Sequence, residues 1–153
     1  MPKRATDYFL IDILIAIDKI KRNTAIATTF DKFISHETVF DATMRELEII
    51  GEAAKYLLAD EKFKHHLPLQ WRKIVDFRNI VAHEYFGIDL DIVYEVVTKK
   101  VPELEKNIFE LLQNFKEDKN LIIAISHAKK ELQKMNRPKS LAYLTEIEKL
   151  LLK

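Results

Sequence analysis

Glycine occupies only two of the 153 positions of this chain, Gly51 and Gly87, and proline only four. Tight hairpin turns and phosphate-binding loops depend on glycine, so the chain has little material for either. Apolar residues instead recur at steps of three and four, and the charged residues are mostly lysine and glutamate. This is the period of amphipathic helices with solvated outer faces, and it predicts an all-α fold.

The apolar pattern places helices along most of the chain. We expect them at Thr6–Arg22, Thr38–Ala59, Leu69–Ala82 and Asp89–Phe115, with two more in Glu117–Lys153 and one apolar turn at Thr29–His36. Pro102 should kink or split the fourth helix, because proline lacks a backbone donor and crowds the preceding turn. The pair Arg137 and Pro138 divides the last two helices.

Composition excludes several classes of protein. The 25 lysines and arginines against 24 acidic residues give a net charge of +1, which excludes a strongly basic nucleic-acid coat but not a local basic site. The absence of cysteine rules out disulfides, thiolate metal sites and cysteine nucleophiles. No apolar run reaches the length of a membrane span, and no signal-peptide pattern opens the chain. We expect a cytoplasmic protein that does not enter a membrane.

The helix at Leu69–Ala82 and its exit carry the residues best suited to chemistry. Asn79 and His83 lie one turn apart on a polar stripe, so the amide could orient the imidazole. Arg78 falls off that stripe and points toward apolar surroundings. Arginine is almost never fully buried unless it is paired. Arg78 therefore reaches solvent, meets an acid such as Glu48 or Glu52, or meets a ligand phosphate.

A glycine inside the helix at Thr38–Ala59 also needs a reason. Gly51 costs roughly 1 kcal/mol against alanine in a helix interior. We expect a neighbouring helix to approach closely there. Glu48, Glu52 and Lys55 form a polar row beside this glycine. That row is interpreted either as part of the active site or as a polar interface with a structural salt bridge to Arg78.

Arg78 and His83 are five residues apart, which is about 140° around an ideal helix. The two side chains converge through the reach of arginine, through distortion at the helix end, or across a symmetric dimer. A two-fold dimer builds each site from both chains and makes this spacing usable. We therefore expect a homodimer.

An arginine and a histidine together suit the cleavage of phosphodiesters in RNA. An imidazole with a reference pKa of about 6.5 can take a proton from a 2′-hydroxyl and return one to the leaving oxygen. A guanidinium can hold the phosphate and stabilise the charge of the transition state. No metal or other cofactor is expected. The adjacent His65 and His66 do not face one another on a helix and are interpreted as surface residues.

Three blocks of the sequence match a known family. Residues 78–85 read R-N-x-x-x-H-x-Y, residues 45–55 read R-E-L-E-I-I-G-E-A-A-K, and residues 7–20 open with Asp-Tyr. In this order the blocks resemble the HepT-like toxins of the HEPN superfamily, over roughly Asp7 to Phe115. The resemblance implies an antiparallel helical bundle at residues 1–116, with residues 117–153 as an additional helical pair packed on the same domain.

The resemblance also implies an activity. Family members dimerise so that two R-x-x-x-x-H motifs line one cleft, and they act as metal-independent endoribonucleases, the toxins of type VII-like toxin–antitoxin pairs. Such cleavage is expected to leave 2′,3′-cyclic phosphates. Arg78 and His83 would then be catalytic, with Asn79, Glu48 and Glu52 supporting them. Tyr85 would be the tyrosine that a minimal nucleotidyltransferase antitoxin modifies with AMP, which blocks phosphate entry by charge and bulk.

The sequence leaves open the role of the C-terminal segment and whether the chain is catalytic. The segment 117–153, which the family pattern does not cover, could add to the core, cover the bundle, extend the dimer or bind the antitoxin. The chain could also be a non-catalytic helical dimer that serves as binding partner or modification target of the nucleotidyltransferase. In that case the surface around Tyr85 is what the partner recognises.

Overall fold

In the computed structural model, which describes residues 5–83 and 87–153, the chain is helical and has no strand within those ranges. The elements are α1 (Asp7–Ile26), α2 (Phe30–Ser35), α3 (Glu37–Ala59), the 3-10 turn η1 (Lys64–His66), α4 (Trp71–His83), α5 (Leu90–Glu95), the π-helical turn η3 (Val96–Lys100), α6 (Val101–Asn114), α7 (Lys119–Lys134) and α8 (Pro138–Leu151). The all-α prediction is confirmed.

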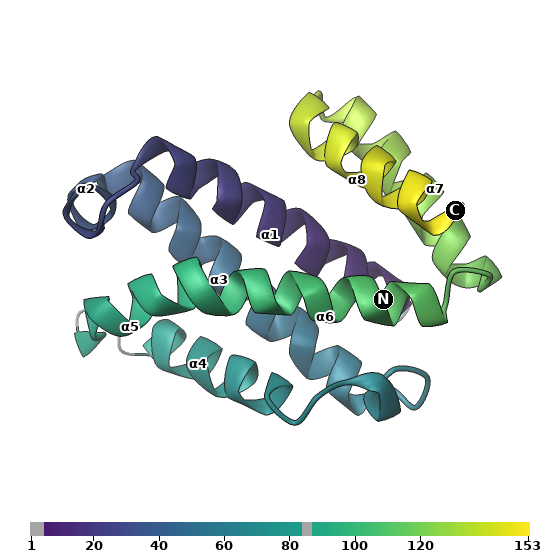
Figure 1. The fold of residues 1–153 in the computed structure, drawn as a ribbon, viewed down its shortest axis with the longest axis horizontal. Coiled ribbons are helices and arrows are strands. Elements are labelled where there is room, and N and C mark those ends of the chain that lie inside the picture. Colours follow the sequence, from purple (N-terminus) through teal and green to yellow (C-terminus); the bar gives the residue numbers. More distant parts are fainter. Residues whose placement is uncertain (1–4, 84–86) are drawn as a thin grey trace.

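The long helices form an antiparallel bundle. α1 packs along α3, α3 packs along α4, and α6 packs on α1, while successive long helices run in opposite directions (Figure 1). α7 and α8 pack on each other and on α1, at the side of the bundle away from α4 (Figure 1). α3 is therefore the element that joins α4 to the rest of the molecule.

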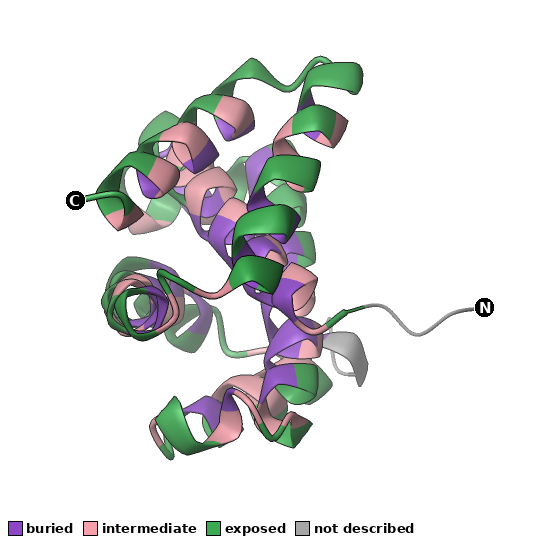
Figure 2. Cartoon of the chain, turned by 90° about the vertical axis from the view of Figure 1, so that its right-hand side faces the viewer, coloured by how far each residue is buried: buried purple, intermediate pink, exposed green. Residues whose placement is uncertain are grey.

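One hydrophobic cluster runs through the described helices. Leu10 and Ile17 of α1, Leu57 of α3 and Ile108 of α6 are all fully buried in it. The buried residues face the neighbouring helices, and the outer sides are exposed (Figure 2). α7 and α8 contribute to the same cluster through Leu121, Ala124, Ile125, Leu144 and Ile147.

Polar contacts also tie the C-terminal helices to the bundle. Arg22 Nη2 of α1 donates to Ser140 Oγ of α8 at 3.1 Å. The Tyr143 hydroxyl donates to Glu105 Oε2 of α6 at 2.9 Å. Burial and the neighbouring carboxylate of Glu105 raise the pKa of Tyr143, so this hydroxyl stays a donor at neutral pH.

The predicted interruption near Pro102 is present. The residues before it form a π-helical turn, in which the Val101 amide donates to the Val96 carbonyl, and Pro102 lies in the first turn of α6. Proline is tolerated there because a first-turn amide has no partner within its own helix. None of the helices in the described part of the chain is long and apolar enough to cross a membrane.

Candidate active site

Arg78 lies at a close approach between α3 and α4. A Cβ added to Gly51 of α3 would overlap the Arg78 Cβ and lie 2.5 Å from its Cγ. Only a residue without a side chain lets the stem of Arg78 cross α3 at this distance. The expected close approach at Gly51 is confirmed, and its partner is the arginine of the candidate site.

The guanidinium of Arg78 is held by an ion pair with Glu52 at the edge of the bundle. Arg78 Nη2 lies 3.4 Å from Glu52 Oε2, and Arg78 Nη1 donates to Asn79 Oδ1 at 3.2 Å. The side chain is 31% exposed. Its buried Nε has no hydrogen-bond partner within the described residues, so the donors of the fork are not all used.

The two predicted glutamates have different partners. Glu52 pairs with Arg78 of α4, as one of the alternatives for Arg78 predicts. Glu48, one turn earlier on α3, lies 3.6 Å from Arg45 Nη1 of the same helix. Both carboxylates are partly exposed and lie on the same side of α3. Glu52 is thus the acid that positions the guanidinium.

Asn79 and His83 both lie in the second half of α4. Asn79 is exposed on that helix, and His83 is its last residue, with a side chain outside what the structure describes. Tyr85 lies outside the described residues. The helical spacing of the apolar residues predicts a core face made of Trp71, Ile74, Phe77, Ile80 and Val81. For Ile80 this prediction is wrong, because the residue is 47% exposed. α3 covers only one side of α4, so the buried stripe is narrow and includes Trp71 and Val81 but not Ile80.

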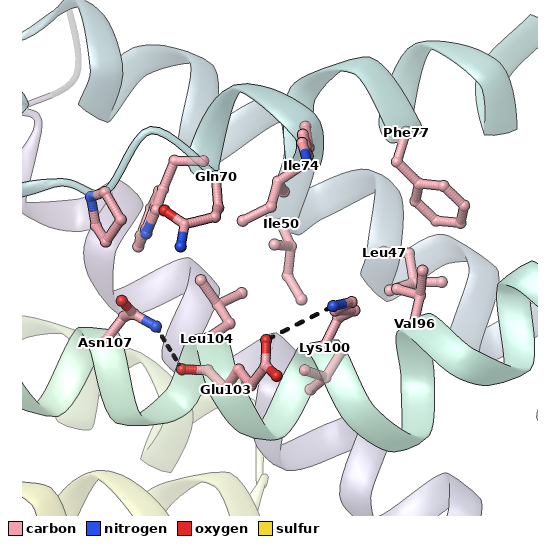
Figure 3. A pocket seen from close by; sticks show the side chains of 14 residues that line it. Leu47, Ile50, Gln70, Ile74, Phe77, Val96, Lys100, Glu103, Leu104 and Asn107 are labelled. Atoms are coloured by element: carbon pink, nitrogen blue, oxygen red, sulfur yellow. Dashed lines mark hydrogen bonds and ion pairs between the residues drawn. The ribbon is translucent and has the colours of Figure 1, made fainter.

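A groove of about 350 Å³ lies between α4, α3 and the segment that runs from η3 into α6. Ile74 and Phe77 of α4 face Val96 and Leu104 across it, and α3 closes the floor with Leu47 and Ile50 (Figure 3). Gln70, Lys100, Glu103 and Asn107 lie at its rim (Figure 3). Arg78, Asn79, Glu48 and Glu52 do not line it, so the groove and the candidate site are separate.

An aromatic pair that the sequence pattern does not predict lies between α1 and α3. Tyr56 stacks on Phe9 of α1, with ring centroids 4.4 Å apart and planes 9° from parallel. Tyr56 is 41% exposed. In the sequence, Tyr56 follows Glu52 by four residues, and this spacing places the two side chains on one face of the helix. Within the described ranges, no group of three histidine, aspartate or glutamate side chains could hold a metal ion.

Comparison with known proteins adds to this geometry. Residues 13–111 match the family model described as "Ribonuclease HepT-like". The match spans α3 and α4, and with them Gly51, Glu52, Arg78 and His83.

Several known proteins match this chain over nearly their whole length. "Putative RNase MJ0127" of Methanocaldococcus jannaschii is 37% identical over 80% of this chain and 100% of its own length. "Putative RNase TTE0752" of Caldanaerobacter subterraneus is 34% identical over 75% of this chain and 97% of its own. "Probable ribonuclease HepT" of Thermococcus cleftensis is 35% identical over 72% of this chain and 98% of its own. No solved structure matches the chain.

Proposed function

The chain belongs to the ribonuclease HepT-like family, and on that premise we propose that it is a metal-independent RNA endonuclease with Arg78 and His83 as catalytic residues. It acts in the cytoplasm as the toxin of a type VII-like toxin–antitoxin pair. The observation that carries the proposal is the placement of Arg78, which Gly51 and Glu52 fix at the edge of α4 within the matched segment.

The surroundings of Arg78 suit a phosphate-binding role. The stem is packed against α3, while the guanidinium is partly exposed and keeps unused donor capacity. A phosphate oxygen can compete with the carboxylate of Glu52, because charge-assisted bonds to a guanidinium fork favour a bidentate oxyanion. Fixing the stem in advance lowers the entropy lost when substrate binds.

His83 supplies the proton transfers of the proposed reaction. The imidazole takes the proton of a ribose 2′-hydroxyl, whose oxygen then attacks the adjacent phosphorus. The bond from phosphorus to the 5′-oxygen breaks, and the imidazolium returns the proton to that oxygen. Arg78 stabilises the charge on the non-bridging oxygens. The products are a 2′,3′-cyclic phosphate and a free 5′-hydroxyl.

The working form in this proposal is a homodimer. Five residues on one helix separate Arg78 from His83, so a site that takes its arginine from one protomer and its histidine from the other avoids the angular mismatch. Asn79 and Glu52 support Arg78 through their contacts with it, and Glu48 completes the polar row on α3.

Neutralisation is part of the same proposal. A minimal nucleotidyltransferase antitoxin adds AMP to Tyr85, two residues from His83. The added phosphates carry negative charge and repel the substrate. Incubating the protein with its nucleotidyltransferase and ATP should raise the intact mass by multiples of AMP, and Tyr85→Phe should abolish the increase.

The dimeric site is tested by mixing two inactive variants. Arg78→Ala and His83→Ala should each abolish RNA cleavage, while His127→Ala, an exposed histidine on α7, serves as the matched control and should cleave normally. Co-refolded Arg78→Ala and His83→Ala chains form heterodimers with one intact shared site. Cleavage that returns in the mixture supports the shared site, and a mixture that stays inactive contradicts it.

A further inference from the structure

The stacked pair of Tyr56 and Phe9 is an aromatic surface that the core does not enclose. Phe9 is partly buried against the hydrophobic cluster, and its ring lies nearly parallel to that of Tyr56. Tyr56 remains 41% exposed in spite of this contact. The stack therefore holds a planar ring in one orientation at the surface of the bundle, and little side-chain entropy remains to be lost there.

This aromatic surface lies beside the arginine of the candidate site. Tyr56 follows Glu52 by four residues on α3, which is one helical turn and about 6 Å along the axis. Side chains on a helix lean toward its N-terminus, so the ring of Tyr56 covers the turn that carries Glu52. Glu52 Oε2 is in turn 3.4 Å from Arg78 Nη2.

Positive charge is available on the same surface. Lys55 is exposed and follows Gly51 by one turn, so it lies along the line where α4 meets α3. By helical spacing, Lys55 and the contact of Arg78 with Gly51 both lie on the α4 side of Tyr56. A flat apolar ring beside two cations is the combination that single-stranded nucleic acids require, since bases stack on aromatic rings and phosphates contact cations.

We propose that Tyr56, backed by Phe9, is a base-stacking subsite for the RNA substrate, and that it receives an unpaired nucleobase next to the phosphate bound by Arg78. The inference rests on the proposed function and deepens it, because it names the substrate class as single-stranded RNA. A base within a duplex has both faces covered by its neighbours and cannot stack on this ring. Hairpin loops and unpaired segments are the RNA elements that fit.

Binding measurements on three variants of Tyr56 test this subsite in the full-length protein. The probe is a single-stranded 2′-O-methyl oligonucleotide carrying 2-aminopurine, which lacks the attacking hydroxyl and whose fluorescence falls when its base stacks. Tyr56→Phe retains the ring and should bind like the native protein with full quenching. Tyr56→Leu retains apolar area without the ring and should weaken binding about tenfold and lose the quenching.

The control substitution is Ile123→Ala, at an exposed apolar residue of α7, and it should leave binding unchanged. Native affinity and quenching in Tyr56→Leu would overturn the subsite. A fall in the sedimentation mass of Tyr56→Leu would also overturn it, because Tyr56 would then belong to a contact between protomers. The result is separable from the proposed function: loss of cleavage in His83→Ala with unchanged binding in Tyr56→Leu rejects the subsite alone.

Discussion

Arg78 and Gly51 show how one residue sets the position of another. The stem of the arginine crosses α3 where the glycine has no side chain, and the guanidinium then reaches Glu52. The sequence predicts the close approach, because a glycine within a regular helix has a cost that packing must offset. It does not predict which residue fills the space, because that depends on the register of two helices joined by a loop.

Substitution of this glycine tests the packing. Gly51→Ala should lower the free energy of unfolding by about 2 kcal/mol, because its Cβ overlaps Arg78 and forces α3 and α4 apart. RNA cleavage should also fall as Arg78 is displaced. Gly87→Ala is the matched control, since no atom of the described residues lies within 4 Å of the added Cβ. Chemical denaturation and a cleavage assay measure both effects, and equal stability of the two variants would contradict the packing argument.

The buried carboxyl of Glu46 should make the stability of the fold depend on pH. Burial raises the pKa of its carboxyl, and Lys19, at 3.8 Å, together with Arg45 and Arg22 only partly opposes this. The folded state therefore binds the proton more tightly than the unfolded state. The contribution to stability is greatest below the usual pKa of 4.5 and is lost as the pH rises through the folded-state value.

Replacing the carboxylate with a neutral amide should remove this pH dependence. Glu46→Gln should unfold at a higher temperature than the native protein near pH 7, and the difference should shrink below about pH 4.5 as Glu46 becomes protonated in both states. Thermal unfolding across this pH range provides the measurement. A variant less stable than the native protein at pH 7 would mean that the ion pair with Lys19 outweighs the cost of burial.

The positions of the helices follow the apolar periodicity closely. Their local form and burial differ from the prediction where contacts with neighbouring helices determine them. The helix predicted at Thr38–Ala59 is observed as α3 over Glu37–Ala59, and the one predicted at Thr6–Arg22 continues to Ile26 in α1. The predicted split near Pro102 is found, but its form is a π-helical turn that the residues alone do not specify. Ile80 is exposed because neighbours cover α4 on fewer sides than the pattern assumes.

A lysine after α3 joins three elements. Lys62 Nζ lies 2.8 Å from Asp7 Oδ1 at the start of α1 and 3.0 Å from Asp118 Oδ2, the residue that caps α7. Burial alone would lower the pKa of Lys62, but the two carboxylates raise it overall. For Asp118, burial alone would raise the pKa, but hydrogen bonds from the Leu121 amide and from Lys62 lower it overall.

Removing this lysine should loosen the junction. Lys62→Met should cost about 1–3 kcal/mol of unfolding free energy near pH 7, because it leaves two carboxylates without their cation. Because the folded-state pKa of Asp118 is lowered, its contribution is present above the usual 3.8 and is lost as the pH falls through the folded-state value. The penalty should therefore shrink in acid. Lys64→Met, which breaks an exposed pair with Glu61, should destabilise the protein much less than Lys62→Met does.

For the whole molecule, we propose a single domain in which residues 117–153 are an extension of the bundle. α7 and α8 share its hydrophobic cluster and pack on α1, whereas Arg78 and Glu52 lie on α4 and α3. The family model ends at residue 111, before this extension begins. The extension thus stabilises α1 from outside and leaves the candidate site to the matched part of the chain.

The central claim is that Arg78 and His83 cleave RNA without a metal ion. The most direct measurement compares the native protein with His83→Ala on a defined single-stranded RNA in the presence of EDTA and analyses the product ends. We expect cleavage by the native protein alone, with 2′,3′-cyclic phosphate and 5′-hydroxyl ends. Equal cleavage by His83→Ala, or no cleavage by native protein whose intact mass shows an unmodified Tyr85, would contradict it.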